Sequence, residues 1–103
     1  MNKLETLIQE GKELYANIIY VEPPENVFRT YDVYDIVDKE RYFLWLNRTK
    51  NLLNKSFERD PLVDEFVALS KKITPDTHLQ MVAILETLRE EYEENPEVSE
   101  VLQ

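Results

Sequence analysis

The amino-acid sequence predicts an all-α fold, a compact domain of four helices. The chain has 103 residues but only one glycine and five prolines, too few for the glycine-containing turns that many short strands require. Leu, Glu, Lys and Ala, which favour helices, recur throughout. A polar capping residue followed by proline, which is typical of a helix start, occurs three times. Because a chain of this length holds one core, we expect a single helical domain over residues 1–103.

The first helix is expected over residues 3–19. Asn2 is suited to cap it, and the side chain of Glu5 can reach back to the backbone N–H of Asn2. Gly11 lies among apolar residues that recur every three or four positions. Its missing Cβ allows close approach, so we expect an aromatic ring from the following segment to pack on it. The apolar stripe consists of Leu4, Leu7, Ile8, Gly11, Leu14, Tyr15, Ile18 and Ile19.

The segment from Val21 to Val37 has neither a helical nor a strand period. Pro23 and Pro24 prevent the first helix from continuing into it. The segment is nevertheless rich in Val, Phe and Tyr, which makes it too apolar for a free linker, and connections of this length are uncommon in compact domains. We therefore expect an ordered, extended arm, with one helical turn or a short strand, packed across the helices.

Three further helices follow from capping signals and apolar spacing. Asp38 is suited to cap the second helix, and the pairs Asp60-Pro61 and Thr74-Pro75 open the third and fourth. The apolar positions after each cap recur at helical spacing. These helices are predicted over residues 39–56, 61–73 and 75–94.

The second helix is expected to be central, with Trp45 in the core. Its inward face is predicted to carry Tyr42, Phe43, Leu44, Trp45, Leu46, Thr49, Leu52, Leu53 and Phe57. The inward face of the third helix is predicted to carry Leu62, Val63, Phe66, Val67, Leu69, Ser70 and Ile73. That of the fourth is predicted to carry Leu79, Val82, Ala83, Ile84, Leu85, Leu88 and Tyr92.

After Asn95-Pro96 a further helical pattern begins and stops within two turns. Two interpretations of residues 96–103 stay open: a frayed end, and the beginning of a fifth helix that would continue in a longer natural chain.

Charge and composition exclude several classes of function. The chain has a formal charge of −9 and no cysteine, which excludes disulfides, zinc-thiolate sites and thiol chemistry. Residues 39–72 carry eight Lys/Arg against five Asp/Glu, whereas the flanking segments are acidic. The net negative charge repels phosphate groups, so we expect no direct binding of nucleic acid or of an anionic membrane. Without a signal peptide or a membrane-spanning run, a cytoplasmic protein is expected.

Candidate catalytic and metal-binding residues are scarce. His78 is the only histidine, and its position in the first turn of the fourth helix favours a surface or boundary residue. A single glycine excludes a glycine-rich phosphate loop, and no Glu-x-x-His ligand pair occurs. We therefore expect neither an enzyme nor a cofactor or metal site.

A set of apolar and aromatic positions resembles a known group of proteins. The carrying residues are Glu10, Gly11, Leu14, the run 28–34, Tyr42, Trp45, Leu46, Phe57, Asp60, Glu65 and Phe66. Together they resemble the N-terminal helical region of uncharacterised bacterial and mobile-element proteins, some linked to abortive infection or to phages. The resemblance covers about residues 4–90 and implies a shared scaffold and an accessory role, without a catalytic residue.

The sequence therefore favours a non-catalytic protein–protein interaction module. The candidate interaction residues are Phe28, Arg29, Tyr31 and Tyr34, because exposed Tyr and Arg residues bind partners well. For any one of the aromatic rings, a place in the core is at least as compatible with the sequence, and a homo-oligomer also stays open. The alternative is an acidic inhibitor that mimics nucleic-acid phosphates and binds a nucleic-acid enzyme. Its candidate acidic face consists of Glu86, Glu90, Glu91, Glu93, Glu94 and Glu97.

Overall fold

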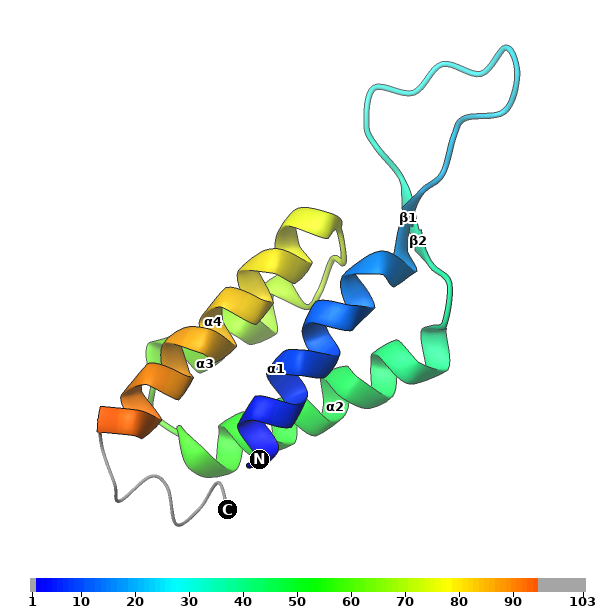
Figure 1. Ribbon diagram of the computed structural model, residues 1–103. Helices are drawn as coiled ribbons and strands as arrows, with labels where there is room; N and C mark the ends of the chain where they lie inside the picture. Colours follow the sequence, from blue (N-terminus) through cyan, green and yellow to red (C-terminus); the bar gives the residue numbers. More distant parts are fainter. Residues whose placement is uncertain (1, 95–103) are drawn as a thin grey trace.

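The computed structural model describes residues 2–94, which form an up-down-up-down bundle of four α-helices with a β-hairpin between the first two (Figure 1). Each helix packs against two neighbours, so that α1, α2, α3 and α4 enclose one core. The elements are α1 (Lys3–Leu14), the 3-10 helix η1 (Tyr15–Asn17), β1 (Ile18–Tyr20), β2 (Tyr34–Ile36), α2 (Lys39–Ser56), α3 (Pro61–Leu69) and α4 (Pro75–Glu94). The predicted helical class is confirmed in outline, with a two-stranded antiparallel sheet added to it. The residues predicted to begin a fifth helix, 96–103, lie outside the described range.

Polar side chains fix the starts of the helices as their sequences predict. The side chain of Asn2 accepts a hydrogen bond from the backbone N–H of Glu5 at 2.9 Å. Asp38 accepts in the same way from the N–H of Arg41 at 3.0 Å. Asp60 accepts from the N–H at position 62 at 2.9 Å, directly before Pro61 opens α3. These caps satisfy N–H groups that the first helical turn leaves free.

Trp45 occupies the centre of the core, as predicted. Its ring is fully buried, and the indole N–H donates to the carbonyl oxygen of Leu7 at 2.8 Å. Gly11 of α1 faces the ring: a Cβ placed there would lie 2.8 Å from Cζ2 of Trp45. The glycine therefore lets an aromatic ring pack directly on the α1 backbone, as predicted, but the ring comes from α2 and not from the segment that follows the first helix.

Two helix ends differ from the prediction. The first helix was expected to reach residue 19, but α1 ends at Leu14, and Ile18 and Ile19 lie in β1. The run of β-branched and aromatic residues there favours a strand once a partner strand is available. The third helix was expected to reach residue 73 but ends at Leu69. The turn that follows carries Ile73, which still packs against the core.

The predicted packing of the arm, residues 21–37, is right only at its end: Tyr34 and Ile36 pack against the core, but the rest of the arm does not. Residues 21–33 do not lie across the helices but form the loop of a hairpin that projects from one end of the bundle (Figure 1). The two strands pair with each other in the register Ile18↔Ile36 and Tyr20↔Tyr34. Pairing of residues 17–21 with residues 33–37 satisfies the backbone of the neck locally, so the hairpin can project from the bundle, and Val27, Phe28 and Tyr31 stay exposed on its loop.

The inward faces of α2 and α4 are narrower than predicted. Phe43 and Leu44 are each 47% exposed, and Leu79 and Ala83 of α4 are also exposed. In a bundle each helix has two neighbours, so only a stripe at three- and four-residue spacing is covered. Met81, which was not predicted to face inward, is fully buried.

Candidate interaction site

The neck of the hairpin is held by cross-strand contacts. The rings of Tyr20 and Tyr34 meet edge to face, with their centroids 5.9 Å apart. The backbone hydrogen bonds between the strands continue beyond both ends of β1 and β2. The N–H of Val21 donates to the carbonyl oxygen of Val33, and the N–H of Val37 donates to the carbonyl oxygen of Asn17, each at 2.8 Å. The pairing thus runs from the end of η1 to the base of the loop, which anchors the loop at its base.

Arg29 folds the loop back onto this neck. Its guanidinium group donates a hydrogen bond to the carbonyl oxygen of Val21 and lies 6.0 Å from the centre of the Tyr20 ring, within cation–π range. Its Nε atom is buried without a hydrogen-bond partner. Arg29, predicted as an interaction residue, therefore organises the loop, and its charge is turned inward.

A tight turn leads to the tip of the loop. The N–H of Val27 donates to the carbonyl of Pro24 at 3.0 Å, and Asn26 has a φ angle of 68°. Asparagine tolerates this left-handed conformation better than most residues, so the sequence suits the turn.

Two large aromatic side chains stand in solvent after this turn. Phe28 is 88% exposed and Tyr31 is 68% exposed, the highest values among the large apolar residues of the described range. Tyr34 lies apart from them, half-buried in β2. Nearby Asp32 contributes, after desolvation, to raising the pKa of the Tyr34 hydroxyl above its ordinary value. The structure thus leaves Phe28 and Tyr31 exposed in the loop and places Arg29 and Tyr34 at the neck.

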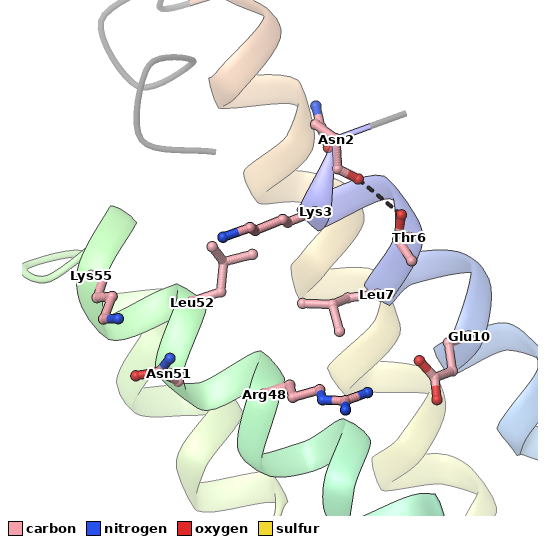
Figure 2. A pocket seen from close by; sticks show the side chains of 9 residues that line it. All are labelled: Asn2, Lys3, Thr6, Leu7, Glu10, Arg48, Asn51, Leu52 and Lys55. Atoms are coloured by element: carbon pink, nitrogen blue, oxygen red, sulfur yellow. Dashed lines mark hydrogen bonds between the residues drawn. The ribbon is translucent and has the colours of Figure 1, made fainter. Parts of the chain in front are cut away.

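A groove of about 450 Å³ lies between α1 and α2, at the end of the bundle opposite the hairpin (Figures 1 and 2). Leu7 and Leu52 form its apolar part. Its walls carry Asn2, Lys3, Thr6, Glu10, Arg48, Asn51 and Lys55. Sequence reasoning missed this site, although the spacing of positions 48, 52 and 55 places them on one face of a helix.

The acidic face predicted for α4 is only partly free. Glu86 forms an ion pair with Lys12 of α1 at 2.8 Å, so its charge is partly neutralised. Glu90 and Glu91 are exposed, and Glu91 also takes part in a polar or electrostatic contact. The side chains of Glu93 and Glu94, and all of Glu97, lie outside the part of the chain whose side chains the structure describes.

His78 is in the core, contrary to the prediction of a surface or boundary residue. It is fully buried, with Nδ1 2.7 Å from the Tyr42 hydroxyl and Nε2 2.6 Å from the carbonyl oxygen of Gly11. Burial lowers the pKa of its imidazole, more than the hydrogen bond to Gly11 raises it. A positive charge would be unfavourable at the N-terminal end of α4, but a neutral imidazole carries none. His78 can therefore be buried in the first turn of this helix.

The side chains that the structure describes, those of residues 2–91, include no cluster of three or more His, Cys, Asp or Glu that could hold a metal ion. Within residues 2–94, no helix is long and apolar enough to cross a membrane. Comparison of the chain with protein-family models, curated proteins and solved structures finds no match. The exposed loop of the hairpin and the groove between α1 and α2 are the two surface features suited to binding a partner.

Proposed function

We propose that this protein is a non-catalytic interaction module that inserts the tip of its hairpin into an apolar pocket of another protein. The observation that carries the proposal is the 88% exposure of Phe28 in the loop of a projecting hairpin that Arg29 braces. Burying such a ring on binding is worth about 1.5–3 kcal/mol. Because Arg29 already orders the loop, little conformational entropy remains to be lost when a partner binds.

The charges around the tip indicate the kind of pocket. Glu22, Glu25 and Asp32 are exposed on the loop, whereas its only cation, Arg29, is engaged at the neck. An apolar pocket with a basic rim complements this arrangement. A pocket with an acidic rim would repel it.

We further propose that the protein acts in the cytoplasm, in a defence-related system of bacterial or phage origin. The absence of cysteine is compatible with a reducing compartment, and the resemblance of the scaffold to the N-terminal regions of bacterial and mobile-element proteins supports the origin.

A pull-down from the source cytosol tests the proposal with three baits: the wild type, Phe28→Ala with Tyr31→Ala, and a variant with Gln at positions 90, 91, 93 and 94. We expect a protein retained by the wild type and by the Gln variant to be lost with the hairpin variant. Retention by the hairpin variant contradicts the proposal.

The Gln variant tests the phosphate-mimic alternative at the same time. It keeps the length and polarity of α4 but removes four carboxylates near the negative end of the helix, which relieves repulsion there. Loss of the partner with this bait alone, together with steep weakening of wild-type binding as salt rises, would favour the acidic inhibitor.

A further inference from the structure

We infer that the groove between α1 and α2 receives the hairpin tip of a second copy of this chain, so that copies associate head to tail. The inference rests on the proposed function, since the inserted element is the same hairpin, and it names the receiving surface. It is argued from the complementarity of two surfaces on one chain: a cationic groove with an apolar floor, and an acidic loop with an aromatic tip.

The groove is cationic in a chain that is acidic overall. Lys3, Arg48 and Lys55 line it, and none of them forms an ion pair with a residue of the described range. The one carboxylate in its wall, Glu10, lies 3.8 Å from the guanidinium of Arg41, outside the groove. Among the described residues, the groove is therefore lined by three cations against the single carboxylate of Glu10, which leaves it with a net positive charge.

The floor of the groove suits an aromatic ring. Leu7 and Leu52 extend into it from α1 and α2, with Lys3 and Arg48 on either side (Figure 2). A volume of about 450 Å³ lies within the range of pockets that hold small ligands and exceeds what one phenyl ring needs. Phe28 can lie between the leucines while the acidic residues of the loop meet the cations on the rim.

The hairpin cannot fill the groove of its own chain. It leaves the bundle at the C-terminal end of α1, whereas the groove is built on the first residues of that helix and the last turns of α2 (Figure 1). The molecule is 57 Å long, and the hairpin forms one end of it. The contact must therefore join two copies, and because it uses different surfaces on each, it leaves one tip and one groove free for further copies.

The test measures molar mass by sedimentation from about 10 μM to about 1 mM, a range that covers weak association. We expect the mass of the wild type to rise with concentration. Phe28→Ala should weaken association about ten- to hundredfold, because the ring loses its buried contact. Arg48→Glu with Lys55→Glu should weaken it at least tenfold by placing carboxylates opposite the acidic loop.

A mixture of the two variants tests the head-to-tail geometry. Phe28→Ala keeps an intact groove and the charge-reversed variant keeps an intact tip, so the mixture should form 1:1 dimers and nothing larger. Lys71→Glu with Lys72→Glu is the matched control: these lysines are exposed and do not line the groove, so the same change of charge should leave association intact. Thermal melts of all variants should match the wild type.

Several results would overturn the inference. They are a wild type that stays monomeric at about 1 mM, a control that associates as poorly as the groove variant, and a mixture that forms no dimers. If the wild type is monomeric but still retains another protein through Phe28, the self-association fails while the proposed function stands. If association survives Phe28→Ala, the hairpin is not the inserted element.

Discussion

The imidazole of His78 and the hydroxyl of Tyr42 form a buried hydrogen bond, with Nδ1 and the oxygen 2.7 Å apart. On the other side of the ring, Nε2 lies 2.6 Å from the carbonyl oxygen of Gly11. A carbonyl can only accept, so Nε2 carries the proton, and Nδ1 of the neutral ring accepts from Tyr42. The hydroxyl stays protonated because burial raises the pKa of Tyr42. One side chain from α4 thus joins α1 and α2 through bonds that satisfy every polar atom involved.

Stability should fall as the pH drops below about 6.5, the ordinary pKa of histidine in an unfolded chain. The folded-state pKa of His78 is lowered, so the unfolded chain binds the proton more readily. The contribution of the neutral ring is therefore complete above about pH 6.5 and is lost as the pH falls toward the folded-state value. We expect the free energy of unfolding, measured with urea, to be lower at pH 5.5 than at pH 7.5.

Because His78 is the only histidine of the chain, a control is available. Carboxylates titrate mostly below this window, so His78→Gln should flatten the pH dependence between pH 7.5 and 5.5. Stability that is unchanged or increases on acidification would contradict a neutral buried ring.

Tyr42→Phe should destabilise the fold by about 1–3 kcal/mol, because it keeps the ring but leaves Nδ1 of His78 buried without a donor. Equilibrium urea unfolding measures this difference. A variant as stable as the wild type would show that the hydroxyl contributes nothing to the network.

Gly11→Ala should be destabilising although alanine is the better helix former. The added Cβ would lie 2.8 Å from Cζ2 of Trp45 and 3.2 Å from Cγ2 of Val82. Overpacking of a core costs about 1–3 kcal/mol, whereas alanine gains at most about 1 kcal/mol over glycine in a helix. A net loss of stability in thermal or urea unfolding is therefore expected.

Two variants locate the cause of that loss. Ala83→Gly, at an exposed position of α4, measures the propensity difference alone and should cost about 1 kcal/mol. In a Trp45→Phe background the smaller ring leaves room, so Gly11→Ala should cost less than it does in the wild type. An equal cost in both backgrounds would show that Trp45 is not the obstacle.

Trp45→Ala should cost about 3–5 kcal/mol, much of the stability of a typical domain, because it removes a fully buried ring and the donor to Leu7. Phe28→Ala should change stability by less than about 0.5 kcal/mol, since its ring touches mainly solvent. Native tryptophan fluorescence should be blue-shifted relative to that of the unfolded chain. Emission like that of tryptophan in water would place Trp45 on the surface.

Local signals predicted the bundle well. Asp38, Asp60 and Pro61 define helix starts through bonds within a few residues, and these starts are confirmed. The three- and four-residue spacing that continues from Tyr42 likewise identifies the buried face of α2. Such features depend on residues close in sequence, so a single sequence contains them.

Features that depend on distant residues could not be predicted. His78 is buried because Gly11, 67 positions away, offers a carbonyl, and no local pattern announces that partner. The hairpin depends on the pairing of Ile18 with Ile36, which competes with the helical continuation of α1. For the candidate site, the sequence identified Phe28 and Tyr31, but their exposure follows only from the direction in which the hairpin leaves the bundle.

Replacing residues 22–32 by Asn-Gly should leave the bundle folded while removing the loop that we propose binds a partner. The change keeps the bonded pair Val21 and Val33 and closes it with a two-residue turn suited to a β-hairpin. No residue of the deleted loop belongs to the core, so the melting temperature should change by only a few degrees, much less than for Trp45→Ala.

Circular dichroism melts and the pull-down are measured on the same preparation, with Phe28→Ala and Tyr31→Ala as the control that keeps the loop length. Unfolding of the deletion variant would show that the loop stabilises the bundle, and binding that survives the deletion would place the interaction site elsewhere.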